Sequence, residues 1–208
     1  MNKIITLLAL TFTFSSGFAQ NMKLTDINLV GGRNFSTFLF KDSQGNQDKT
    51  LDYEALSTFG INFNLIAGRH ILRPELSFRQ AGAKSDYDGI ALSWKMNYFD
   101  VNLGYLYNVL NSGRFVVAPG LGLGAGYMLT GEQYIGSTRY SITDNKSLKP
   151  FDFGLQGLAH FRANITENMA ISLEYRFGMG ITQIENDINA QKSRNLYHSA
   201  LLGIGIRL

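Results

Sequence analysis

Acidic and basic residues recur two positions apart in several segments of the chain. Arg73 and Glu75 form one such pair, and Glu174 and Arg176 form another. Two carboxylates held close together are typical of acid–base catalysis, whereas carboxylates beside guanidinium groups form ion pairs. The charged residues of interest are Arg73, Glu75, Arg79, Asp100, Asp152, Arg162, Glu174, Arg176 and Arg207. The elements that position them decide which chemistry is open to them.

Glycine also recurs with a period of two, at Gly120, Gly122, Gly124 and Gly126. A dinucleotide-binding fingerprint has a different spacing and needs a helix that opens within it. A period of two instead places all four glycines on one face of a β-strand. We therefore interpret them as a stripe of small residues and expect no cofactor.

The three histidines, His70, His160 and His198, are dispersed and have no metal-ligand spacing, and the chain has no cysteine. We therefore expect no metal site, no disulfide and no thiol nucleophile. His198 and Ser199 could be taken for part of a lipid-modifying enzyme, but neighbouring residues of a strand point to opposite faces. We therefore expect no catalytic residue.

The composition excludes other classes of protein. The formal net charge is +3, from 19 basic and 16 acidic residues among 208, and no basic stripe is present, so nucleic acid is not an expected partner. A hydrophobic content of 45% excludes wholesale disorder. Nothing in the composition or motifs indicates a small-molecule substrate.

Residues 1–19 have the layout of a secretory signal peptide. A short basic start is followed by the apolar run IITLLALTFTF and by small residues before a cut after Ala19. The run is too short to span a bilayer as a helix. We expect residues 1–19 to be removed and residues 20–208 to form one domain of an exported protein.

The exported part contains eight segments in which apolar and polar residues alternate. In the seventh, Ile171, Leu173 and Tyr175 share one parity, and Glu174 and Arg176 share the other. Such alternation is typical of β-strands that separate two environments. The segments are residues 27–40, 53–67, 71–84, 91–109, 114–129, 151–164, 169–182 and 196–208. The fourth changes phase near Tyr98 and Phe99, which predicts a β-bulge.

The connections alternate between long polar loops and tight turns. Residues 41–52, 85–90, 130–149 and 184–194 form the long ones. This rhythm predicts an all-β fold, an eight-stranded antiparallel up-and-down transmembrane β-barrel with short periplasmic turns and long outer loops. The polar face is rich in glycine with isolated charges, which suits a narrow lumen better than a solvated surface. Aromatic residues near the strand ends, such as Tyr127, Phe151 and Tyr197, are expected on the opposite face, in girdles at the membrane interfaces. The alternative is a soluble exported barrel that binds a lipophilic ligand.

Residues 72–84, LRPELSFRQAGAK, resemble a strand motif of the PorT-like outer-membrane β-barrel family, close to l-x-P-E-L-x-Y-S-x-x-G-A-K. Residues 98–103 resemble the family's Y-L-E-I-P-L, with Asn102 in place of proline, and residues 32–36 resemble its G-x-N-x-S. The chain also ends in Leu208 and not in an aromatic residue. The resemblance implies a porin-like protein integral to the outer membrane of a Gram-negative bacterium. Some relatives are linked to protein secretion.

We therefore expect a non-enzymatic protein with a structural or interaction role, associated with secretion or envelope assembly. Its expected partners are outer-membrane lipid and other envelope proteins. The inward charges are expected to form an ion-pair network, with an ion or proton path as the alternative. Tyr134, Arg139 and Tyr140 are the best candidates for a partner-binding loop. Two alternatives stay open: an enzyme acting on lipid or peptide at the outer rim, and a small diffusion pore.

Overall fold

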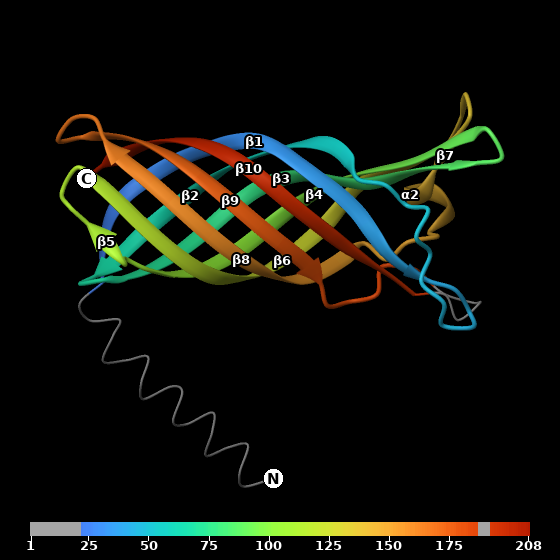
Figure 1. Cartoon of the computed structure of the whole chain (residues 1–208), viewed down its shortest axis with the longest axis horizontal. Helices are drawn as coiled ribbons and strands as arrows, with labels where there is room; N and C mark the ends of the chain where they lie inside the picture. The colour runs from blue at the N-terminus through green and yellow to red at the C-terminus, as the bar shows by residue number, and fades with distance from the viewer. Residues whose placement is uncertain (1–21, 187–191) are drawn as a thin grey trace, which may run out of the picture.

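The computed structural model describes residues 22–186 and 192–208, which form a closed β-barrel (Figure 1). Eight long strands make up the wall within these residues. They are β1 (Lys23–Lys41), β2 (Glu54–Ala67), β3 (His70–Tyr87), β4 (Ile90–Tyr107), β6 (Phe115–Ile135), β8 (Phe151–Asn164), β9 (Met169–Gly180) and β10 (Lys192–Arg207). Three short elements lie at the barrel ends: β5 (Leu110–Asn111), β7 (Thr138–Ser141) and α2 (Ile142–Asn145).

Each long strand pairs with a neighbour on both sides. The order is β4-β3-β2-β1-β10-β9-β8-β6, and pairing between β4 and β6 closes the ring. All of these pairings are antiparallel, including that between β1 and β10, the first and last strands. Closure satisfies the backbone N–H and C=O groups of the wall, which a spanning structure requires because the bilayer interior offers no water. The predicted fold is confirmed.

The two faces of the wall are inverted relative to a soluble barrel. In β9, Leu173 and Tyr175 are 51% and 48% exposed, whereas Glu174 and Arg176 are 2% and 7% exposed. Apolar side chains therefore cover the outside, and polar ones fill most of the lumen, which also holds a buried apolar cluster towards each end. This arrangement suits a barrel surrounded by hydrocarbon, and it excludes the soluble barrel with an apolar interior.

The two ends of the barrel differ. At one end, here called the turn end, tight connections join β2 to β3 and β8 to β9, and β1 begins and β10 ends there (Figure 1). At the other, the loop end, two predicted loops differ from the structure. The predicted loop 130–149 contains the end of β6, which runs to Ile135, together with β7 and α2. The predicted loop 85–90 is wrong, because β3 and β4 continue to a two-residue turn of Asp88 and Gly89, both with positive φ. This backbone is that of a tight hairpin, for which Asp-Gly is well suited.

The predicted bulge lies beside the expected position, but on the facing strand. Asn97 pairs with Thr130 and Tyr98 pairs with Met128, so Leu129 of β6 is the extra residue. Even-numbered residues of β4 face the lumen on both sides of this point. The phase change seen in the sequence arises because the lumen is lined by apolar residues near the loop end and by polar residues below.

Residues 1–19, the expected signal peptide, lie outside the described residues. No helix in residues 22–186 and 192–208 is long and apolar enough to span a membrane.

Candidate functional site

The centre of the lumen holds a chain of alternating charges from two strands. Arg176 donates from both terminal nitrogens to the two carboxylate oxygens of Glu75, at 2.6 Å each. Its Nε donates to Oε1 of Glu174 at 2.5 Å, and Oε2 of Glu174 accepts a hydrogen bond from Nη1 of Arg73. Nδ1 of His160 lies 3.0 Å from the same oxygen. We call these five residues the central cluster.

The central cluster joins opposite walls. Arg73 and Glu75 lie on β3, and Glu174 and Arg176 lie on β9, four places away in the ring of eight. The alternating pattern of the sequence points all four side chains inward, and the register brings them to one level. All four are less than 9% exposed. Buried charges of this kind are stable only when they are paired and hydrogen-bonded.

A second cluster lies nearer the loop end, around Arg79. Its Nε donates to Asp100 at 2.7 Å, and its Nη2 lies 3.3 Å from Asp152 on β8. The guanidinium group is held between the rings of Tyr98 and Tyr197, with centroids 4.8 and 4.9 Å away. Such stacking suits the flat, delocalised arginine cation. We call these five residues the upper cluster.

A third ion pair lies near the turn end. Nη2 of Arg162 on β8 donates to Oδ1 of Asp26 on β1 at 2.6 Å, and Asp26 is 1% exposed. Thr25 donates to the other oxygen of Asp26 at 2.9 Å. Ion pairs therefore cross the lumen at three levels.

The structure thus brings together eight of the nine charged residues singled out from the sequence: Arg73, Glu75, Arg79, Asp100, Asp152, Arg162, Glu174 and Arg176. Arg207 differs from the expectation. It is exposed, because it is the last residue of β10 and lies at the open turn end. No ion pair within the described residues involves it.

Two partners of these ion pairs, Asp26 and His160, were not predicted from the sequence. Asp26 was left out because the first strand was expected to begin at residue 27, whereas β1 begins at Lys23. Extending the alternation of Asn28 and Val30 back by one step would have found it. His160 has the parity of the polar face, but its contact with Glu174 depends on the register of β8 against β9, which alternation does not reveal.

The lumen has little space beside these charges. The cavity next to the central cluster has a volume of about 10 Å³. That is about the minimum that holds one water molecule. Glu75 and Glu174 are held by guanidinium groups and leave no room for a substrate. The arrangement therefore suits a cross-braced plug better than acid–base catalysis or ion passage.

The glycine stripe makes room for this plug. A Cβ atom on Gly124 would lie 2.4 Å from Oδ1 of Asn102, and one on Gly126 would lie 2.3 Å from Oδ1 of Asp100. Both distances are far below van der Waals contact. The glycines on β6 thus let the polar side chains of β4 lie flat against the wall, which agrees with their interpretation as a small-residue stripe.

His70 and His198 lie on the outer face, far apart along the chain, whereas His160 lies in the lumen. His70 faces outward near the turn end, with Nδ1 2.6 Å from the hydroxyl of Tyr105. His198 faces outward beside Phe35, Tyr53 and Tyr175. No cluster of metal-ligating side chains occurs among the residues that the structure describes.

His198 and Ser199 point to opposite faces, as the strand geometry predicts. Ser199 is 2% exposed and its hydroxyl donates to Oδ1 of Asn34 in the lumen at 2.8 Å. The two side chains therefore cannot form a nucleophile–base pair with each other.

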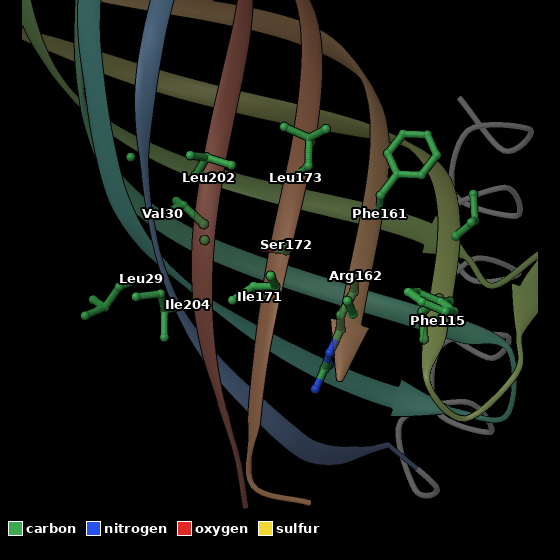
Figure 2. Close-up of a pocket in the computed structure, with 15 residues that line it drawn as sticks. Leu29, Val30, Phe115, Phe161, Arg162, Ile171, Ser172, Leu173, Leu202 and Ile204 are labelled. Carbon is green, nitrogen blue, oxygen red and sulfur yellow. The ribbon is translucent and has the colours of Figure 1, made fainter. Parts of the chain in front are cut away.

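The outer face offers an apolar surface for lipid. Figure 2 shows part of it, where Leu29, Leu173 and Leu202 lie at a mostly apolar hollow of about 750 Å³ near the turn end. Aromatic side chains that were expected in interfacial girdles, such as Tyr127 and Phe151, are exposed on this face. Tyr197, expected there too, instead faces the lumen and stacks on Arg79.

At the loop end, β6 continues beyond its pairing with β8 and pairs with β7, while its other side stays paired with β4. Tyr134 of β6 lies opposite Arg139 of β7, and Glu132 links them. The hydroxyl of Tyr134 donates to Oε2 of Glu132 at 2.6 Å, and Arg139 forms an ion pair with Oε1. Tyr140 is 47% exposed. The structure therefore joins Tyr134 and Arg139 in one polar group and leaves Tyr140 on the surface beside it.

The sequence was compared with models of known protein families and with known proteins. The sequence model of a family described as outer membrane protein beta-barrel domain matches residues 5–196. No curated protein sequence matches the chain.

Several solved structures are similar. Neisserial surface protein A has 13% identity and a TM-score of 0.48, over 90% of this chain and 99% of that one. The attachment invasion locus protein Ail of Yersinia pestis has 15% identity and a TM-score of 0.43, over 89% and 100%. The outer membrane protein OprG from Pseudomonas aeruginosa has 14% identity and a TM-score of 0.48, over 91% and 98%.

Proposed function

This chain belongs to the outer membrane protein beta-barrel domain family, and we propose that it is a non-enzymatic interaction protein that binds a polypeptide outside the cell. The barrel is integral to the outer membrane of a Gram-negative cell, with its turn end in the periplasm and its loop end outside. Because paired charges fill the lumen and lipid covers the wall, the loop end is the part of the barrel that a partner outside the cell can reach.

The observation that carries the proposal is the edge of β7. A tilted transmembrane strand needs about 9–11 residues. At the loop end the strands β3, β4 and β6 continue past that length, with 18, 18 and 21 residues. β7 adds to this extension by pairing with β6. Within the described residues no strand pairs with its other side.

An open strand edge presents unpaired N–H and C=O groups, which an extended polypeptide can pair with. Side chains at this edge suit such a partner. Arg139 and Tyr140 are exposed, and Arg and Tyr are enriched among residues that dominate binding energy at protein interfaces. The link from Glu132 to Tyr134 and Arg139 stiffens the hairpin, which lowers the entropy lost on binding.

The resemblance at residues 72–84 supports a finer form of this proposal. In that form the partner is a component of a PorT-like secretion or envelope assembly.

Photo-cross-linking in intact cells tests the proposal. A photoreactive phenylalanine analogue replaces Tyr140, and the matched control replaces Tyr175, an exposed tyrosine on the lipid-facing wall. We expect a polypeptide adduct from position 140 and none from position 175. The absence of any polypeptide adduct from position 140, in a variant that inserts normally, would overturn the proposal.

A further inference from the structure

A pocket of about 230 Å³ opens at the loop end of the barrel, apart from the β7 edge. Its walls come from strands and loops that are distant in sequence. Phe38 of β1 and Trp94 of β4 contribute aromatic rings, and Leu148 and Ile184 contribute aliphatic side chains from the two loops on the opposite side. Phe38 and Trp94 meet edge to face, with ring centroids 6.1 Å apart.

The pocket is blind. Phe38, Trp94 and Leu148 pack against a buried apolar cluster that includes Met96 and Tyr98. This apolar cluster separates the pocket from Arg79, because its member Tyr98 stacks on the guanidinium group of Arg79. The pocket is therefore a recess with a floor, and a molecule that enters it does not pass into the lumen.

Backbone hydrogen bonds hold the walls in place. The N–H of Lys149 donates to the carbonyl of Ile184 at 2.6 Å, and the N–H of Ile184 donates to the carbonyl of Ser193 at 3.0 Å. On the other side, the N–H of Asp48 donates to the carbonyl of Phe40 at 3.1 Å. Each lining loop is thus tied to a barrel strand or to another loop, so the recess is formed before any ligand binds.

The charged side chains among the described lining residues are both acidic. They are Asp48, which is partly exposed, and Glu185. The hydroxyl of Ser193, a residue 3% exposed, donates to Oε1 of Glu185 at 2.6 Å and orients its carboxylate. Six basic residues adjoin lining residues in the sequence, but all are exposed and none is among the described lining residues: Lys41, Lys49, Lys95, Lys149, Lys192 and Arg194. An apolar recess with two carboxylates and no basic group among its described lining residues is complementary to a cation.

We propose that this recess binds small ligands with an apolar, ring-sized body and one ammonium group. An apolar cavity of about 150 Å³ accommodates benzene. A recess of 230 Å³ therefore has room for a ring and a short alkyl chain. The apolar body would contact Phe38, Trp94 and Ile184, and the ammonium group would donate to Asp48 and Glu185.

The chain provides its own reporter, because Trp94 is its one tryptophan. The purified barrel in detergent micelles is titrated with 2-phenylethylammonium, with neutral 2-phenylethanol and with anionic 3-phenylpropionate, and the fluorescence of Trp94 is followed. We expect the cation to bind saturably and at least about tenfold more tightly than the alcohol, and the anion to bind more weakly still. No saturable change with the cation, or equal binding of cation and alcohol, would overturn the proposal.

Charge variants locate the site. Asp48→Asn with Glu185→Gln removes both carboxylates at nearly constant shape, and we expect the preference for the cation over the alcohol to be lost. The matched control, Asp88→Asn with Glu167→Gln, removes two exposed carboxylates elsewhere and should keep the preference. If the first double variant still prefers the cation over the alcohol, Asp48 and Glu185 do not bind the ammonium group. A folded variant is recognised on a gel, because its boiled and unboiled samples migrate differently. If a variant does not fold, the comparison of the three probes on the unaltered protein still tests the proposal.

Discussion

Arg176 on β9 and Glu75 on β3 form a two-point ion pair across the full width of the barrel, with both nitrogen–oxygen distances at 2.6 Å. The two strands lie four places apart in the ring, so this contact ties together walls that no backbone hydrogen bond connects. The ion pairs of Arg79 and Arg162 do the same at two other levels. The lumen is thus braced by charge pairs along its length.

Substitution of Glu75 tests the brace. Glu75→Gln removes the charge that neutralises Arg176 but keeps the shape of the side chain. Removing one partner of a buried pair costs about 3–5 kcal/mol, because the other charge stays buried. We expect a loss of about 3 kcal/mol in the free energy of unfolding, measured by urea unfolding in lipid vesicles.

The control for this experiment is Glu167→Gln, in the exposed turn between β8 and β9, which should change the same free energy by less than about 0.5 kcal/mol. If Glu75→Gln were as mild as the control, the central cluster would not brace the barrel.

The glycine stripe gives a second test. Gly126→Ala places a methyl group 2.3 Å from Oδ1 of Asp100, which must move away from Arg79. Overpacking of this kind costs about 1–3 kcal/mol. The matched control is Gly157→Ala on β8, whose Cβ would meet only the carbonyl oxygen of Phe177 at 3.9 Å. Equal unfolding free energies for the two variants would mean that the stripe has no packing role.

The enzyme alternative can be tested at His198 and Ser199. Because these side chains lie on opposite faces of β10, we expect the variant His198→Ala with Ser199→Ala to leave the lipid composition of the outer membrane unchanged. Mass spectrometry of extracted lipids from cells with the native and the variant protein makes this comparison. A lipid species that depends on either residue would contradict the non-enzymatic assignment.

Much of the fold could be predicted from the sequence, because successive side chains of each strand point alternately to the lipid and to the lumen. Met169, Ile171 and Glu174 occupy the faces that their parity indicates, and β8 has the predicted bounds. The ends of β3 and β4 extend beyond the membrane, where neither face meets lipid, so apolar and polar residues no longer alternate there. For that reason residues 85–90 were expected to be a loop and are a hairpin.

The candidate site was predictable as a set of inward charges but not as specific pairs. Parity assigns Glu174 to the lumen, whereas its contact with His160 and Arg73 depends on register and barrel diameter. Tyr197 was expected at the lipid interface because it is aromatic, yet it stacks on Arg79. The recess beside Trp94 follows no motif, because residues of three loops and of the strands β1, β4 and β10 assemble it. The sequence therefore predicted no small-molecule ligand.

Conductance in a planar lipid bilayer decides whether the paired charges of the lumen leave a channel. Purified, folded protein is inserted into the bilayer, and current is recorded at constant voltage in concentrated salt. The account predicts no stepwise increase in current, because the cavity beside Arg73 and Glu75 has a volume of only about 10 Å³. Discrete, reproducible steps would contradict it and would make the barrel a diffusion pore.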